Sequence, residues 1–246
     1  MASKCVLNLE LIDYIKFVVP IYLLEFFAAL AGTIYLKKGK NQHTSTKYFV
    51  WFLWYTLGTE LFSNYGVIAS FSEFKYFSFI EGTVFQRTKW VYNIFTLVSS
   101  VFLTLYFSFY VKSVLWKKFV KIASLLFVVS SLLHFCFTDV FFREDSKYVN
   151  LLGTLLVFIS VLVFYFEILR TDVLLNLKRF LPVYISIGVL VFYLCMTPLS
   201  IFSEYFNKEN TNFVELQSHL VLYSNLFMYS IFILGFYICS KKKKSF

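Results

Sequence analysis

The stretch "IKFVVPIYLLEFFAALAGTIYLKK", residues 15–38, decides the fold class of this chain. It holds an apolar run long enough to cross a lipid bilayer as a helix, since a crossing needs about 20 residues. Two lysines, Lys37 and Lys38, end the run. The stretch therefore predicts a transmembrane helix that is followed by a basic loop.

The composition extends this prediction to the whole chain. Of its 246 residues, 59% are hydrophobic and 15% are charged, whereas soluble domains carry about 25% charged residues. Apolar segments of spanning length follow one another at residues 12–36, 48–70, 90–111, 119–138, 149–169, 180–203 and 219–240. We therefore expect an all-α fold, a polytopic membrane bundle of seven transmembrane helices that forms a single domain over residues 1–246.

Basic residues are concentrated in every second connecting segment. Four regions carry 15 of the 23 Lys and Arg residues: 37–47, 112–121, 170–179 and 241–244. Because the cytoplasmic loops of membrane proteins are enriched in Lys and Arg, the N-terminus is predicted outside and the C-terminus inside. This orientation signal accounts for the net charge of +9, so the lipid bilayer is the expected partner and nucleic acid is not.

Two carboxylates, Glu25 and Glu60, interrupt the first two apolar segments. An ionisable residue within a membrane segment is costly and suggests a function. Counted from the basic loop between the two segments, both acids lie about 18–20 Å from the inner edge at 1.5 Å per residue. Two close carboxylates in a low dielectric do not both stay ionised, so the pair is a candidate site for a proton, a cation or an amine. The alternative is two protonated acids that hold helices together through hydrogen bonds to Tyr, Ser or Thr.

Three further polar residues share a predicted level slightly outward of the acids: Asn64, His134 and Asn225. They are either the floor of a ligand pocket that opens to the outer face or three separate helix–helix hydrogen bonds. Pro198 is expected to kink the sixth segment, because proline removes a backbone hydrogen bond. The sequence holds no CxxC pair, HExxH motif or phosphate-binding loop, so neither a metal nor a cofactor is expected.

Aromatic residues make up 22% of the chain, an excess that the codon bias of an AT-rich genome would explain without any binding function. In the outer loop 71–89, Phe71, Phe74 and Phe77 are three residues apart. This spacing predicts either a short amphipathic helix at the membrane interface or an aromatic belt that anchors the flanking helices.

Three stretches resemble a group of short, uncharacterised multi-span proteins from Bacteroidetes-type bacteria. They are "WVYNIFTLVSS" (90–100), "LKRFLPVYISIGVLVFY" (177–193) and "SNLFMYSIFILGFYICSKKKK" (224–244). The resemblance implies a multi-pass protein of the bacterial inner membrane and favours a signalling role. The group carries no established activity, so the resemblance implies no site residues.

The sequence therefore leaves three functions open. The first is a sensor or accessory subunit that binds a ligand or lipid in its outer half and passes a signal to a partner protein at the basic inner loops. The second is a proton- or cation-coupled transporter of a small solute that uses Glu25 and Glu60. The third is an intramembrane lipid-modifying enzyme, for which the sequence offers no catalytic set, so an enzyme is not expected.

Overall fold

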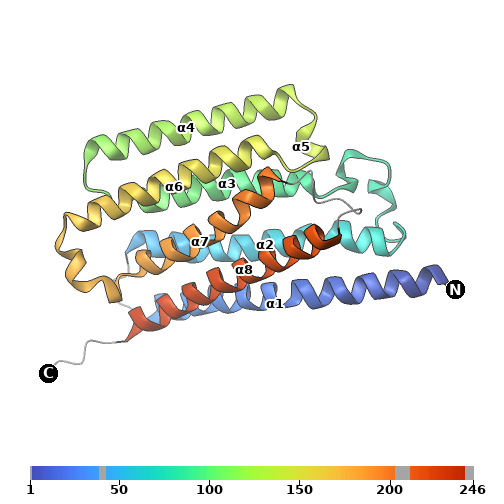
Figure 1. Cartoon of the computed structure of the whole chain (residues 1–246), viewed down its shortest axis with the longest axis horizontal. Coiled ribbons are helices and arrows are strands. Elements are labelled where there is room, and N and C mark those ends of the chain that lie inside the picture. The colour runs from blue at the N-terminus through green and yellow to red at the C-terminus, as the bar shows by residue number, and fades with distance from the viewer. Residues whose placement is uncertain (1, 39–42, 203–210, 242–246) are drawn as a thin grey trace.

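The computed structural model describes residues 2–38, 43–202 and 211–241, and the regular structure in these residues is entirely helical (Figure 1). The long helices are α1 (Ala2–Lys38), α2 (Thr44–Phe71), α3 (Lys89–Ser108), α4 (Val114–Phe137), α6 (Lys147–Leu169), α7 (Leu181–Ile201) and α8 (Thr211–Ser240). The short elements are α5 (Val140–Arg143) and the 3₁₀ segments η1 (Ser78–Ile80), η2 (Val84–Gln86) and η3 (Asp172–Arg179). The predicted all-α fold is confirmed for these residues.

Six of the described helices contain a stretch that is long and apolar enough to cross a membrane. These stretches are Tyr14–Lys38, Lys89–Ser108, Val114–Phe137, Lys147–Leu169, Leu181–Ile201 and Val214–Ser240. Large apolar side chains cover the outside of the bundle, and on α4 Leu125 and Leu126 are 64% and 63% exposed. Since a helix satisfies its own backbone hydrogen bonds and lipid accepts apolar side chains, these features indicate a multi-pass membrane protein.

Six of the long helices form a closed ring, and α4 packs outside it. Contacts around the ring run from α1 to α2, α3, α6, α7 and α8, and from α8 back to α1. Helix α4 contacts α3 and α6, so it lies at the edge of the bundle opposite α1 and α8 (Figure 1). The six helices of the ring enclose a central space, which is either filled by side chains or left as a cavity.

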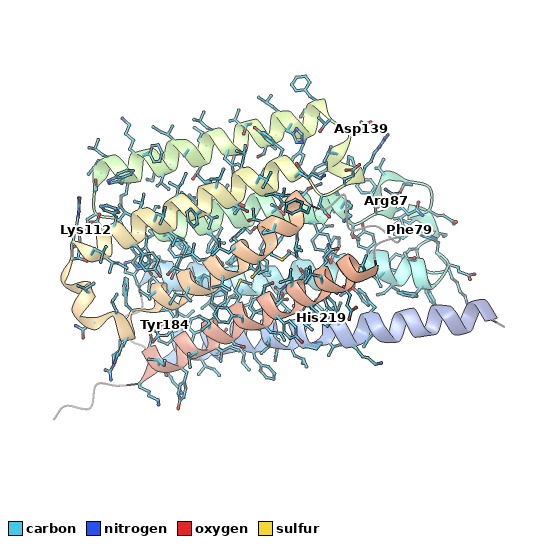
Figure 2. The ribbon with its side chains drawn as sticks, viewed as in Figure 1. Phe79, Arg87, Lys112, Asp139, Tyr184 and His219 are labelled. Carbon is cyan, nitrogen blue, oxygen red and sulfur yellow. The ribbon has the colours of Figure 1, made fainter. Side chains whose placement is uncertain are left out.

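One end of the bundle is basic. The helix ends that carry Lys37, Lys38 and Lys241 lie there, and Figure 2 shows Lys112 at the same end. The opposite end carries the loops around Arg87 and Asp139 (Figure 2). We call these two regions the basic end and the far end.

Local sequence determines where several helices begin. The Ser146 hydroxyl accepts a hydrogen bond from the backbone N–H of Val149 at 3.3 Å and caps α6. At the start of α2, His43 Nδ1 accepts one from the backbone N–H of Ser45 at 3.3 Å. Pro182 lies in the first turn of α7, where its missing N–H costs no helical hydrogen bond. These caps place the helix ends in the polar loops between the apolar segments.

Buried aromatic side chains fill the centre of the six-helix ring near the basic end. The ring centroid of Phe49 lies 5.2 Å from that of Phe232, and the centroid of Phe107 lies 5.3 Å from that of Phe164. Such pairs contribute about 0.5–1.5 kcal/mol each beyond the area that they bury. We call the group the aromatic plug, and its members are Phe49, Tyr106, Phe107, Phe164, Phe232 and Phe236, each at most 3% exposed.

In the outer loop 71–89, the structure differs from the prediction of a short amphipathic helix. Glu73 and Phe74 have positive φ angles of 48° and 57°, which interrupt the helix after α2. An L-residue with a side chain rarely adopts this conformation, and a continuous α-helix cannot include it. The ring of Phe77 instead lies 6.4 Å from that of Tyr65 on α2. The loop therefore agrees better with the aromatic-belt alternative than with an amphipathic helix.

Candidate functional site

A cavity of about 470 Å³ lies between α3, α6 and α7. Its walls extend from Ser99 and Tyr193, near the middle of their helices, to Lys89, Asp145 and Lys147 at the far end. The volume is within the range of small-molecule sites, which is about 300–1,000 Å³. The aromatic plug fills the ring on the other side, so the cavity is closed toward the basic end.

Polar side chains line the cavity as stripes with helical spacing. Residues at i, i+4 and i+7 share one face of a helix, and the stripes are Tyr92, Thr96 and Ser99 on α3, Asn150 and Thr154 on α6, and Tyr193, Thr197 and Ser200 on α7. Sequence reasoning missed this site because it searched the spans for ionisable residues. The repeated hydroxyl and amide spacing is the signal that would have found it.

The charged lining residues lie only at the mouth of the cavity. Lys89 Nζ forms an ion pair with a carboxylate oxygen of Asp145, and Lys147 is the third charged residue of the lining. Deeper in the cavity the walls present hydroxyls, the amide of Asn150 and the rings of Phe95 and Phe192. The interior can therefore form hydrogen bonds and stack against a ring, but it offers no net charge.

The predicted acids are each bonded to a tyrosine, and the partner of Glu60 lines the cavity. Glu25 is 3% exposed, and its Oε1 accepts a hydrogen bond from the hydroxyl of Tyr229 on α8 at 2.8 Å. Glu60 Oε2 accepts one from the hydroxyl of Tyr92 on α3 at 3.2 Å. Tyr22, one turn before Glu25 on α1, contacts the backbone oxygen of Glu60 at 3.4 Å, so the structure places the two acids on neighbouring turns of α1 and α2.

Asn64 belongs to the same region. Its Oδ1 accepts hydrogen bonds from the hydroxyls of Tyr14 at 3.0 Å and Tyr22 at 3.2 Å. The Tyr22 hydroxyl also contacts the backbone oxygen of Glu60 at 3.4 Å. We call this group the acid–tyrosine cluster, and its members are Tyr14, Tyr22, Glu25, Glu60, Asn64, Tyr92 and Tyr229.

Tyr92 is the residue that joins the cluster to the cavity. Its side chain lines the cavity, and its hydroxyl contacts Glu60 Oε2 and, at 2.8 Å, the hydroxyl of Ser63. A molecule in the cavity that bonded to this hydroxyl would compete with the carboxylate of Glu60. The cluster and the cavity are therefore two parts of one site that share a single side chain.

The structure separates the remaining predicted residues. His134 lies on α4, outside the ring, where its imidazole packs 4.8 Å from the ring of Tyr148. Asn225 lies on α8, and its Nδ2 donates to the backbone oxygen of Val221 in its own helix at 2.8 Å. Neither residue lines the cavity, so His134, Asn225 and Asn64 do not form the floor of one pocket. Pro198 lies within α7, between two residues that do line the cavity, Thr197 and Leu199.

A buried asparagine that the sequence did not single out supports the mouth of the cavity. Asn93 is 3% exposed, and its Nδ2 donates to the backbone oxygens of Phe141 and Glu144, each at 2.9 Å. Its Oδ1 accepts from the backbone N–H of Ser146 at 2.9 Å. Asn93 thereby fixes the α4–α6 connection against α3, next to Asp145 and Lys147.

The fold and the site together define a multi-pass helical membrane protein with a polar cavity inside the bundle. Comparison with known proteins gives no match, since no family model, curated protein or solved structure matches the chain. The cavity, the acid–tyrosine cluster and the aromatic plug are therefore the basis for any statement of function.

Proposed function

We propose that the protein is a sensor or accessory subunit of the bacterial inner membrane that binds a small polar ligand in the cavity between α3, α6 and α7. The cavity carries this proposal, because it is of ligand size, lined by polar stripes and closed at one end. The resemblance of residues 90–244 to multi-span proteins of Bacteroidetes-type bacteria supports the bacterial membrane and the signalling role.

The proposed orientation makes the cavity a binding site for an external ligand. Helix α2 is taken as the seventh span, since it completes the ring and is 28 residues long, although Lys47 and Glu60 make it less apolar than its neighbours. With seven spans and the basic end in the cytoplasm, the N-terminus is outside and the C-terminus inside. The cavity then opens outward and the aromatic plug faces inward.

The lining favours an uncharged ligand with several hydroxyl groups. Hydroxyls and amides both donate and accept hydrogen bonds, as a sugar or polyol requires. The rings of Phe95, Phe192 and Tyr193 offer apolar faces for the C–H groups of such a ligand. A permanent charge inside the cavity would find no opposite charge there.

Helix α7 offers a route from the cavity to a partner protein. Thr197 and Ser200 line the cavity on either side of Pro198, which cannot donate the usual backbone hydrogen bond to Leu194. A ligand that contacts this weakened turn favours one arrangement of α7 over another. The partner would read that change at the basic inner loops.

A second candidate is a proton- or cation-coupled transporter, and the position of Tyr92 favours it. A solute in the cavity would contact the same hydroxyl that bonds Glu60, so binding would change the surroundings of the acid pair. The aromatic plug would then be the inner gate of an outward-open state.

A thermal-stability experiment tests whether the cavity binds a ligand, as the first candidate requires. The thermal stability of the purified protein is measured with sugars, polyols, nucleosides and charged solutes, for the wild type and for Thr154→Trp, which fills the cavity. We expect an uncharged hydroxylated compound to stabilise the wild type alone. Equal stabilisation of both proteins would contradict binding in the cavity.

Uptake of the same compound into proteoliposomes then decides between sensing and transport. A sensor binds the compound without accumulating it, whatever gradient is applied. Accumulation that depends on a proton or sodium gradient and is lost in Glu60→Gln would favour the transporter.

A further inference from the structure

The carboxyl group of Glu25 has only one of its oxygens bonded. Oε1 accepts the hydrogen bond from Tyr229, whereas Oε2 is fully buried and has no hydrogen-bond partner. Burying a polar atom without a partner costs free energy, and nearly all buried polar atoms in proteins therefore have one. The free oxygen of Glu25 lacks the partner that its burial requires.

The second acid is also bonded to a tyrosine, but it is only half-buried. Tyr92 donates to Oε2 of Glu60 at 3.2 Å. The ion pairs Lys89–Asp145, Arg143–Asp139 and His219–Glu215 involve neither Glu25 nor Glu60. Each acid is thus bonded to a tyrosine through one oxygen, and Glu25 presents a second, buried oxygen without a partner.

Either a proton shared with Glu60 or a cation would supply a partner for the free oxygen of Glu25. A shared proton leaves the pair with one negative charge. A cation bound to Oε2 of Glu25 and to the carboxyl of Glu60 offsets this charge without protonating either acid. Hydrogen bonds from Tyr229 and Tyr92 would orient the two ligands, as outer partners do in known metal sites.

The ligand atoms determine the class of cation. Carboxylate and hydroxyl oxygens suit hard cations, whereas zinc and copper prefer sites with Cys or His. Within the part of the chain that the structure describes, no three His, Cys, Asp or Glu residues gather to hold a metal ion, so a site here would combine two carboxyls with neutral oxygens. We propose that Glu25 and Glu60 bind one hard cation, sodium or calcium, between α1 and α2 in the acid–tyrosine cluster.

The cation site is a separate proposal from the ligand of the cavity, and it is tested in the absence of that ligand. If the protein is a sensor, the cation holds α1 and α2 together next to Tyr92, which lines the cavity. If it is a transporter, the same cation is the coupling ion. Cation binding is measured on the protein without a ligand in the cavity. A protein that binds no cation therefore leaves the cavity proposal unaffected.

The test is the thermal stability of the purified full-length protein in detergent. The unfolding midpoint is followed while sodium chloride replaces choline chloride at constant ionic strength, and calcium chloride is titrated in a second series. We expect one of the two cations to raise the midpoint by several degrees with saturation, because a ligand that binds only the folded state stabilises it. The choline series removes the general effect of salt.

Variants place the effect at the two carboxyls. Glu25→Gln and Glu60→Gln can still accept the tyrosine hydrogen bonds, and each should abolish the cation-dependent shift. Glu167→Gln on α6 removes an acid outside the cluster and should retain it. Tyr229→Phe keeps both carboxyls, so it should weaken the apparent affinity and preserve a shift at high cation concentration.

Two results would overturn the proposal. One is a midpoint that does not respond to sodium or calcium beyond the choline control, which would leave two protonated acids as the explanation. The other is a shift that survives in both Gln variants. If Glu25→Gln does not fold, Glu60→Gln and the shortened Glu25→Asp decide the question, since a cation site requires both to change the cation dependence.

Discussion

The hydroxyl of Tyr229 reaches Glu25 across 204 positions of the sequence. This contact explains how α1 can carry a carboxylate in the middle of an apolar span. The acid is buried between α1 and α8 and bonded there, so it does not face lipid. A tyrosine supplies the polar atom without adding charge to the bundle.

Removing that hydroxyl should destabilise the protein measurably. Tyr229→Phe leaves Glu25 Oε1 buried without its donor, and we expect a loss of about 1–2 kcal/mol in the free energy of unfolding. Tyr223→Phe is the matched control, because Tyr223 lies on the same helix and is 62% exposed. Unfolding in mixed micelles measures both variants, and an equal loss in the two would contradict the role of the buried bond.

Asn93 should matter more to stability than Asn225. Asn93→Ala breaks hydrogen bonds to Phe141, Glu144 and Ser146 and leaves buried backbone groups unpaired, which should cost about 2–3 kcal/mol. The bond of Asn225 stays within its own helix, so Asn225→Ala should cost less than about 1 kcal/mol. The same unfolding assay compares them, and the reverse order would show that Asn93 does not anchor the α4–α6 connection.

Sequence reasoning found both acids but not their partners. Glu25 and Glu60 are conspicuous because charge is rare in an apolar span, and their shared depth followed from the basic loop between them. Tyr92 and Tyr229 were hidden among 18 tyrosines. A tyrosine in a membrane segment is ordinary, and only the packing of α3 and α8 against α1 and α2 selects these two.

At the scale of elements, the packing of α8 against α7 depends on glycine. A Cβ added at Gly235 of α8 would lie 2.7 Å from Cβ of Tyr184 on α7. Because that atom is fixed to the backbone, α7 and α8 would have to move apart. Small residues allow membrane helices to approach in this way.

A pair of Gly→Ala variants tests this packing. Gly235→Ala should destabilise the protein by about 1–3 kcal/mol, the usual cost of overpacking. Gly58→Ala is the control, since a Cβ there would have no neighbour within 4 Å, and alanine's higher helix propensity should make it neutral or stabilising by up to about 1 kcal/mol. Equal thermal stability of the two variants would contradict the close approach of α7 and α8.

The helices themselves were predictable and their arrangement was not. Each predicted span coincides with a long helix, because apolar runs between basic and polar loops are a strong local signal. The neighbours α3–α6 and α1–α8 in the ring are not consecutive in sequence, so loop lengths could not predict them. For that reason His134 was expected at a shared pocket, whereas α4 holds it outside the ring.

At the scale of the whole molecule, the ring is filled at one end and open at the other. The aromatic plug fills it near the basic end, and polar stripes from three helices line the cavity in the other half. Codon bias remains an explanation for the overall aromatic content, but it does not explain why six of these rings gather at one level. We therefore expect the cavity to be reached from one side only.

Side-specific cysteine labelling tests this asymmetry most directly. Thr154→Cys places a thiol in the cavity wall, and Ser160→Cys places one in the buried core of the same helix, 2% exposed. Both are made in a background without Cys5, Cys136, Cys195 and Cys239. A membrane-impermeant thiol reagent is then added to the outside of right-side-out vesicles or to the cytoplasmic face of inverted ones.

We predict that Thr154→Cys is labelled from the outside and not from the cytoplasmic face, while Ser160→Cys is labelled from neither. Labelling of Thr154→Cys from the cytoplasmic face, or no labelling of it from either side, would contradict an outward-facing cavity that is closed by the aromatic plug.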